Sequence, residues 1–245
     1  MKKKILFLTG SALIILACLV AYAYLSTLGK TDLSFKIHIN EKLVHQSGFG
    51  ESPTFAIWIE NPETNEIRAV YVTRRAAEGD WEGKAEVPTA LPQWFETEKK
   101  LKQSLSKSKN ADGFSGATPK PGYFTAETGL EPGSRWICWI EVNLAGDFND
   151  TYAGSINEEN ESDKFLSGQP AILYRADIKA IKDSVFQPSV AGMTVLGASN
   201  GKIIQPLYGI TSATEIFDKI EISIVQPKPK IIKRHKIITS SVTKK

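Results

Sequence analysis

The fold class of this chain is set by the stretch Leu33-Ser34-Phe35-Lys36-Ile37-His38-Ile39. Apolar and polar side chains alternate along it, so an extended strand places the two kinds on opposite faces. Such alternation is typical of an antiparallel strand that has one face in a core and the other in water. The stretch therefore predicts a β-rich domain, with His38 on the polar face of the strand.

Short strand patterns separated by turn signals continue through the rest of the chain. The turn-rich residues 61–65 join two of them into a pair, and Asn200-Gly201 is a strong hairpin signal between two others. Seven or more short strands of this kind predict an all-β fold, a two-sheet antiparallel β-sandwich of the immunoglobulin or fibronectin type. The strands expected beyond Leu33–Ile39 are Thr54–Glu60, Ala69–Thr73, Ser134–Leu144, Ala171–Ile178, Met193–Ala198, Lys202–Leu207 and Lys219–Val225.

One segment departs from the strand pattern. Residues Pro92–Ser108 are predicted to form a helix, in which Trp94, Leu101 and Leu105 fall near one face. A loop rich in glycine and proline follows, from residue 110 to residue 122. Function tends to collect in a helix and a long loop inserted between strands. This insertion is therefore the first place to expect a functional site.

Three side chains on the strand patterns are expected to be buried. Trp58 and Trp139 alternate in phase with apolar neighbours, so both are predicted to face the core. Cys138 is the only cysteine outside the N-terminal segment, so it cannot form an intrachain disulfide. Its apolar surroundings favour a small buried hydrophobic residue over a reactive thiol.

The N-terminus has the pattern of an export signal. Lys2–Lys4 precede an apolar run, Ile5–Leu25, that contains no charged residue. A helix needs about 20 residues to cross a bilayer, and the lysines would remain in the cytoplasm. The rest of the chain is therefore expected to be periplasmic or otherwise extracytoplasmic and anchored to the cytoplasmic membrane. Two other fates remain open, namely signal cleavage after Ala23 and lipidation at Cys18, although the apolar run continues past Cys18.

The net charge of +3 hides an uneven distribution. Residues 227–245 carry seven lysines and arginines and no acid, and together with Lys2–Lys4 they leave a net charge of −7 for residues 5–226. The tail is expected to be a disordered, solvated end or to contact anionic lipid or cell-wall polymer. Nucleic acid is not an expected partner outside the cell. Three divisions are predicted: a signal peptide or anchor at residues 1–30, the β-sandwich at residues 31–226, and the basic tail at residues 227–245.

The sharpest chemical pattern is Asp112-Gly113-Phe114-Ser115-Gly116-Ala117-Thr118. It resembles the D-x-x-[ST]-[GS]-A-T pattern at which bacterial flavin transferases attach FMN covalently to a threonine of membrane-bound oxidoreductases. Small residues suit a loop that must enter another enzyme's cleft. The alternative is an ordinary crossover that leads into the next strand. The resemblance implies a phosphoester bond at Thr118, with the cofactor-binding loop formed by Asp112, Ser115, Gly116 and Ala117.

A second group of polar side chains lies between two strand patterns. On a strand, Glu141 and Asn143 project to the face opposite Cys138. Oxygen ligands grouped in this way can hold a hard cation such as calcium. The spacing is not that of an EF-hand, and Asn and Asp also form turns. The candidate metal ligands are Glu141, Asn143, Asp147 and Asn149.

The sequence does not contain a complete catalytic apparatus. Its three histidines, His38, His45 and His235, lie far apart. It contains no nucleophile elbow, Walker loop, dinucleotide fingerprint or zinc-ligand set. No catalytic residue is predicted, and a hydrolase is the weakest interpretation.

Seven segments, taken in their order along the chain, carry a family resemblance. They are Phe55–Glu60, Val72–Arg75, Ala90–Trp94, Gly116–Gly122, Glu141–Asn143, Asp147–Asn149 and Gly168–Ala171. Together they resemble the bacterial periplasmic family catalogued as domain of unknown function 2271, over roughly residues 33–226. The resemblance implies an extracytoplasmic β-sandwich. It also implies that the gene lies near genes for flavin transferases and membrane redox proteins. It implies no established activity, and the flagellar-scaffold-like stretch of many members is not evident after Gly122.

Two functions of different classes follow. The first is an exported redox accessory protein that carries FMN on Thr118, with a flavin transferase and a membrane redox protein as partners. It would be an electron carrier rather than a self-sufficient enzyme, and Phe114, Tyr123 and Trp94 are the aromatic residues nearest in sequence that could hold the flavin ring. The second is a non-catalytic extracytoplasmic binding or structural module, whose best polar site is Glu141, Asn143, Asp147 and Asn149.

Overall fold

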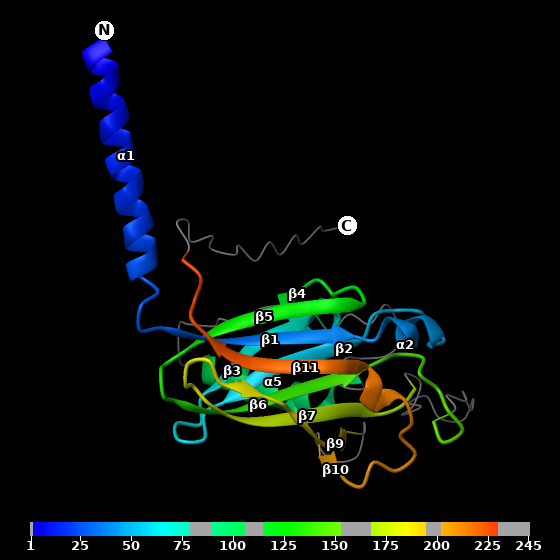
Figure 1. Cartoon of the computed structure of the whole chain (residues 1–245). Helices are drawn as coiled ribbons and strands as arrows, with labels where there is room; N and C mark the ends of the chain where they lie inside the picture. The colour runs from blue at the N-terminus through cyan, green and yellow to red at the C-terminus, as the bar shows by residue number, and fades with distance from the viewer. Residues whose placement is uncertain (1, 79–89, 106–114, 153–167, 195–201, 230–245) are drawn as a thin grey trace. The chain divides into compact units, whose positions relative to one another are not determined.

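The computed structural model describes residues 2–78, 90–105, 115–152, 168–194 and 202–229 (Figure 1). It gives the backbone alone for residues 2–12, 78, 104, 105 and 115. The chain divides into two compact units, one of which is Thr31–Val225. The other combines Met1–Lys30 with Gln226–Lys245 and contains helix α1 (Lys2–Leu25). Among the helices that the structure describes, none is long and apolar enough to cross a membrane.

The unit Thr31–Val225 is built mainly of strands. Its strands are β1 (Thr31–Ile39), β2 (Thr54–Glu60), β3 (Ile67–Thr73), β4 (Ser115–Gly116), β5 (Gly122–Leu130), β6 (Arg135–Asn143), β7 (Ala171–Lys179), β8 (Val185–Phe186), β9 (Ser189–Thr194), β10 (Ile203–Ile204) and β11 (Phe217–Val225). Its helices are α2 (Glu41–Gln46), α3 (Arg74–Glu78), α5 (Pro92–Leu105) and the 3-10 helix η1 (Ala213–Glu215).

These strands form two packed sheets (Figure 1). In the described residues, the smaller sheet has the order β5-β1-β11-β8 and the larger has the order β10-β9-β7-β6-β2-β3-β4. Neighbouring strands are antiparallel, except that β4 runs parallel to β3. The predicted two-sheet sandwich with one inserted helix is confirmed.

The alternation that begins at Leu33 places four side chains of β1 between the sheets. Leu33, Phe35, Ile37 and Ile39 are fully buried and share one apolar cluster with residues of β2, β6, β7 and β11. Cys138 lies in the same cluster, as its neighbours in sequence predicted. Complete burial of a large apolar side chain stabilises a fold by about 1.5–3 kcal/mol, so this cluster holds the two sheets together.

The outer face of the larger sheet is covered as well. Leu91 and Trp94 pack there in a second apolar cluster with Trp58, whose ring centroid lies 5.7 Å from that of Trp94. Trp58 and Trp139 both project to this outer face; the predicted core position is confirmed for Trp58, which is a member of this second cluster, while Trp139 packs against the cluster. Trp58 is fully buried and Trp139 is partly buried. Alternation shows which side chains share a face, but a sheet that is buried on both faces offers two apolar environments.

Several element bounds differ from the predicted ones. The helix predicted to end at Ser108 is described as far as Leu105, and residues 106–108 lie outside the described residues. The predicted pair of strands joined by residues 61–65 is confirmed as β2 and β3. The strand predicted at Met193–Ala198 is β9, which ends at Thr194 and pairs with β10, while the turn between them lies outside the description. Strand β5 was not predicted.

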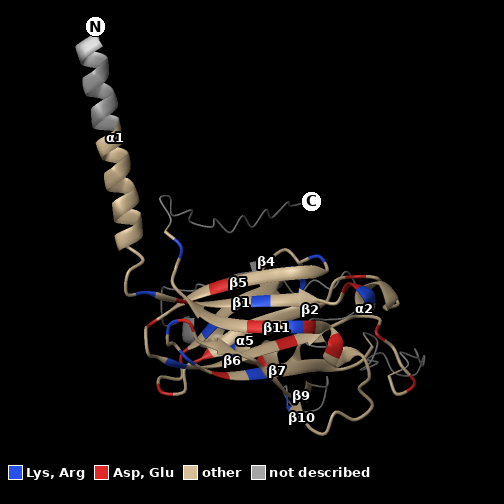
Figure 2. Cartoon of the chain, in the orientation of Figure 1, with Lys and Arg blue, Asp and Glu red and all other residues tan. Residues whose placement is uncertain are grey.

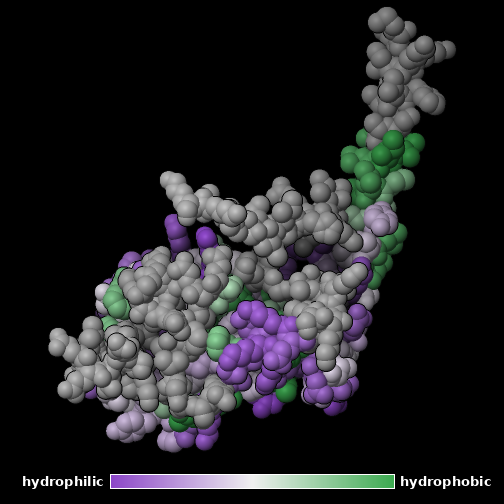
Figure 3. Space-filling view, turned by 180° about the vertical axis from the view of Figure 1, so that it is seen from behind, coloured by the Kyte–Doolittle hydropathy of each residue, from purple (hydrophilic) through white to green (hydrophobic). Residues whose placement is uncertain are grey.

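The two outer surfaces differ in character. Figure 2 shows lysines and acids interspersed along β1, β5 and β11, on the outer face of the smaller sheet. On the other side, α5 turns Lys99, Lys100 and Lys102 outward. Seen from behind, this side of the molecule presents a hydrophilic patch (Figure 3). The helix thus has an apolar side toward the sheet and a polar side away from it, as the spacing of its apolar residues predicted.

Candidate functional site

The flavin-type pattern lies on a crossover between the two sheets. Ser115 and Gly116 pair with Val72 and Thr73 at the edge of the larger sheet. Residues 117–121 then lead into β5, which is the edge strand of the smaller sheet. The described part of the pattern, Ser115–Thr118, therefore lies where the chain changes sheet, which is the position that the crossover alternative expects.

Tyr71 of β3 holds this crossover in place. Its hydroxyl donates a hydrogen bond of 2.6 Å to the carbonyl oxygen of Ala117. A Cβ atom added to Gly116 would lie 2.7 Å from Cε2 of the Tyr71 ring, which is closer than real Cβ contacts. The ring is buried against Phe55 and Phe124, at centroid distances of 5.4 Å and 4.5 Å, and burial raises the pKa of Tyr71 to about 12. Glycine is thus required at position 116 for packing.

Thr118 is only partly buried at the outer end of this crossover. Ala117 beside it is exposed. Gly116, Ala117 and Thr118 lie on one segment, which the hydrogen bond between Tyr71 and Ala117 fixes in place. Asp112 lies outside the described residues, and for Ser115 the description covers the backbone alone. The arrangement presents a threonine hydroxyl on a short, well-anchored edge of the sandwich.

Of the two predicted aromatic neighbours that the structure describes, Trp94 and Tyr123, only Tyr123 is open to a flavin ring. Phe114 lies outside the described residues. Trp94 is only 2% exposed, because it is packed between α5 and the larger sheet. Tyr123, the second residue of β5, is 63% exposed and is the remaining candidate.

The second predicted group begins with a buried carboxylate that caps a helix. Glu141 is fully buried on β6 and accepts hydrogen bonds from the backbone N–H groups of Gln93 (3.1 Å) and Trp94 (2.6 Å), in the first turn of α5. The hydroxyl of Thr194 donates a third bond, of 2.6 Å. Burial raises the pKa of Glu141 to about 7, although these three hydrogen bonds oppose the shift. Glu141 therefore accepts the hydrogen bonds of two backbone N–H groups that a helix leaves unpaired at its N-terminus.

Asn143 and Asp147 bind one backbone segment from two sides. The Asn143 amide donates to the carbonyl oxygen of Gln169 (2.9 Å), and the N–H of Gln169 donates to Oδ1 of Asp147 (2.8 Å). Gly168 allows this approach, because its φ is +104° and an added Cβ atom would lie against the Asp147 carboxylate. Burial raises the pKa of Asp147 to about 8, opposed by the bond from Gln169.

The side chain of Gln169 extends this network to a third segment. Its Nε2 donates to the carbonyl oxygen of Asp147 (2.8 Å) and to the Ser212 hydroxyl (3.0 Å), and its Oε1 accepts from the N–H of Thr211 (2.7 Å). Asn149 donates to the carbonyl oxygen of Gly209 (2.9 Å). The network ties the end of β6 to the segments before β7 and η1, so its first role is structural.

The four candidate metal ligands do not form a set of free ligands. Glu141 is bound to the start of α5, and the Asn149 side chain closes a turn by accepting from the N–H groups of Thr151 (3.0 Å) and Tyr152 (2.8 Å). The described residues contain no group of three or more His, Cys, Asp or Glu side chains able to hold a metal ion. Two buried oxygens, Asn143 Oδ1 and Asp147 Oδ2, lack a hydrogen-bond partner within the described part of the chain.

The histidines are also separate in space. His38 Nδ1 lies 2.6 Å from Asp218 Oδ1, on the outer face of the smaller sheet. His45 lies on α2, 3.7 Å from Glu41, and His235 is outside the described residues. The polar partners of the two described histidines are carboxylates, not hydroxyl or thiol groups, so the hydrolase interpretation gains no support.

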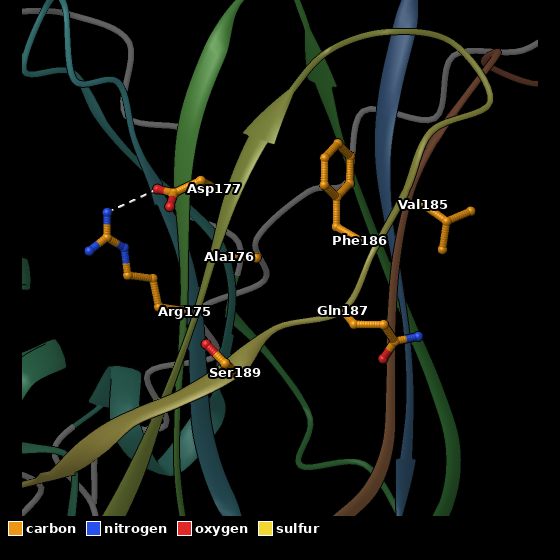
Figure 4. Close-up of a pocket in the computed structure, with 7 residues that line it drawn as sticks. All are labelled: Arg175, Ala176, Asp177, Val185, Phe186, Gln187 and Ser189. Carbon is orange, nitrogen blue, oxygen red and sulfur yellow. Dashed lines mark hydrogen bonds and ion pairs between the residues drawn. The ribbon is translucent and has the colours of Figure 1, made fainter.

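An open groove of about 510 Å³ lies apart from these residues (Figure 4). It is formed where β7 and β9 of the larger sheet approach β8 of the smaller sheet. Arg175 and Asp177 form an ion pair of 2.9 Å on its rim, across from Phe186 and the exposed Val185. None of the site residues predicted from the sequence lines this groove.

Sequence reasoning did not single out Tyr71, Thr194 or Gln169 as members of these sites. Gln169 occurs in a segment of the family resemblance, which was the only signal that pointed to it. Tyr71 and Thr194 look like ordinary strand residues, because their partners lie 46 and 53 residues away. In comparisons with known proteins, the chain matches no family model, no curated protein and no solved structure.

Proposed function

We propose that this chain is an exported, membrane-tethered redox accessory protein that carries FMN on Thr118 and exchanges electrons with a membrane partner. The observation that carries the proposal is the position of Thr118, partly exposed on a crossover that Tyr71 holds at the sheet edge. A transferase must reach the hydroxyl, and the exposure of Thr118 and Ala117 meets that requirement. The complete sequence match from Asp112 to Thr118 and the resemblance to the periplasmic family add support.

The attachment chemistry balances with a flavin adenine dinucleotide as donor. The Thr118 oxygen attacks the phosphorus of the FMN half, and a phosphoester bond forms. The bond between the two phosphates of the dinucleotide breaks, AMP leaves, and a base of the transferase takes the hydroxyl proton. No oxidant or reductant is consumed. A covalent bond suits an exported protein, because a dissociable flavin would be lost by diffusion.

The proposed location rests on the sequence of the N-terminus. Lys2–Lys4 and the uncharged run Ile5–Leu25 place the sandwich on the outer side of the cytoplasmic membrane. The flavin transferase and the membrane redox partner would act in that same compartment.

The test is co-expression of the full chain with a flavin transferase. We expect a fluorescent band on a denaturing gel and a mass increase of one FMN phosphoester for the unsubstituted chain. Thr118→Val removes the hydroxyl but nearly keeps the shape, so it should abolish both signals. Thr125→Val is the matched control, because Thr125 is an exposed threonine on the adjoining strand β5 and should leave labelling unchanged.

Absence of label on the unsubstituted chain beside an active transferase, or equal label on Thr118→Val, would end this proposal. The structural module would then be the better account. The hydrogen-bond network around Gln169 fits that alternative, since it uses the polar side chains to join chain segments.

A further inference from the structure

We propose that a flavin attached at Thr118 docks its ring on the outer face of the smaller sheet, stacked on Tyr123 with Lys36 and His38 beside it. This inference rests on the proposed function and deepens it, because it names the residues that hold the ring and adjust its reduction potential.

Tyr123 stands out on this face. It is a large aromatic residue that is 63% exposed, on a strand whose inward side chains pack in the core. The side chain is nonetheless held in place by its neighbours on β1. The His38 ring meets it edge-on at a centroid distance of 4.6 Å, and the Lys36 ammonium lies 4.9 Å from the ring centroid. An exposed but fixed aromatic ring is a suitable surface for stacking a planar ligand.

His38 is itself fixed by a third strand. Its Nδ1 atom lies 2.6 Å from Oδ1 of Asp218 on β11, and its register partner on the same strand is Lys219. Three adjacent strands therefore contribute to one patch of Tyr123, His38, Lys36, Asp218 and Lys219. We call these five residues the Tyr123 patch. The patch combines an aromatic platform with two lysines and one acid, Asp218, which is paired with His38. The lysines outnumber the acid, so the patch suits a planar ligand that gains negative charge.

The Tyr123 patch lies within reach of Thr118. Only residues 119–122 separate Thr118 from Tyr123. Because an extended chain advances at most about 3.6 Å per residue, the two Cα atoms can be no more than roughly 18 Å apart. The ribityl phosphate arm of FMN covers part of that distance. The crossover also runs from the edge of one sheet to β5 itself, so the tether begins beside the face that carries the patch.

The chemistry of flavin reduction fits this patch. Stacking on a tyrosine ring keeps the isoalloxazine in a defined position and quenches its fluorescence. The reduced ring is anionic when N1 loses its proton, and nearby cations stabilise that form by Coulomb attraction. Lys36, with its ammonium beside the platform, should therefore raise the midpoint potential of the bound flavin. The charge can be reached by solvent on the outer face, so added salt should weaken its effect.

The test uses the full chain after flavin attachment. The amount of attached flavin is read from the gel and the intact mass, and the docking is read from fluorescence per attached flavin and from the midpoint potential. The variants are Tyr123→Ala and Lys36→Gln. Glu131→Gln is the matched control, because Glu131 is an exposed acid just beyond the opposite end of β5, eight residues from Tyr123 and away from the patch.

We expect all three variants to carry as much flavin as the unsubstituted chain. Tyr123→Ala should raise the emission per attached flavin and its quenching by iodide, and Lys36→Gln should lower the midpoint potential, while Glu131→Gln changes neither. Equal labelling with unchanged emission and potential in Tyr123→Ala and Lys36→Gln would overturn the docking alone. An unlabelled chain would overturn the proposed function and the docking together. Unchanged melting temperatures of the variants exclude unfolding as the cause of any difference.

Discussion

The Glu141 carboxylate on β6 accepts a hydrogen bond of 2.6 Å from the backbone N–H of Trp94, in the first turn of α5. A strand residue thus caps a helix that lies 47 residues earlier in the chain. This bond, together with the apolar cluster around Trp58, positions the inserted helix on the larger sheet. Because the capping group is buried and titratable, it makes the stability of the fold depend on pH.

The first prediction concerns Glu141→Gln. Burial raises the pKa of Glu141 from 4.5 to about 7, so the folded protein binds the proton more tightly than the unfolded chain. The contribution of this group to stability is fully present below pH 4.5 and is lost as the pH rises through about 7. In Glu141→Gln the free energy of unfolding should decline less steeply with pH between these values, by at most about 1.4 kcal/mol per pH unit. Urea unfolding between pH 4 and 8 measures the slope, and an unchanged slope in the variant would contradict the assignment.

The second prediction concerns Asp147→Asn. Burial raises the pKa of Asp147 from 3.8 to about 8, so its contribution to stability is likewise lost as the pH rises, here up to about pH 8. Asparagine can still accept the bond from the Gln169 N–H but never ionises. The variant should therefore gain stability relative to the unsubstituted protein as the pH rises from 4 to 8. The same urea series checks this, and a relative loss at high pH would show that the ionised carboxylate is stabilising.

The third prediction concerns the crossover. Gly116→Ala forces a methyl group against the buried Tyr71 ring and should cost about 1–3 kcal/mol, as overpacking does. Gly129→Ala is the control, because its added Cβ would lie 3.7 Å from Asp32 Oδ1, an ordinary contact. Tyr71→Phe removes the bond to Ala117 and should cost about 1 kcal/mol. Thermal unfolding ranks the three, and a Gly129→Ala variant less stable than Gly116→Ala would refute the packing role.

The fourth prediction concerns Cys138. Its side chain is fully buried in the core between the sheets, and burial raises the pKa of the thiol well above its usual range. Thiolate is the reactive form, so Cys138 should resist alkylation in the folded protein and react once the protein is unfolded in urea. The exposed Cys18 would obscure this result, so the experiment uses Cys18→Ser. Rapid alkylation of the folded Cys18→Ser chain, read by intact mass, would show that the core opens easily.

The fifth prediction concerns topology. Protease added to intact spheroplasts should digest the sandwich, because Lys2–Lys4 and the apolar run after them direct the rest of the chain outward. A cytoplasmic enzyme of the same cells serves as the control and should survive. Full protection of the chain under conditions that digest it after lysis would place it inside.

The sequence by itself determined the strand pattern and the facing of most strand residues. Alternation from Leu33 to Ile39 correctly separated the buried side chains of β1 from the outward ones. The alternation along β6 likewise placed Glu141 and Asn143 on the face opposite Cys138. These are local properties, because neighbouring side chains on a strand must point to opposite faces. Strand β5 was not predicted, because small and polar residues such as Ala126, Thr128 and Gly129 weaken the alternation of apolar and polar side chains along it.

Only the tertiary structure decided what covers each face and which distant residues meet. No local pattern shows that α5 buries the outer face of the larger sheet, so the sequence did not reveal that Trp58 and Trp139 belong to a second apolar cluster on that face. Tyr71 and Ala117, or Glu141 and Trp94, are brought together by sheet packing across more than 40 residues. The same packing gives the predicted metal ligands hydrogen-bond partners within the protein, so their role in the structure is to join chain segments. Buried polar groups generally have such partners.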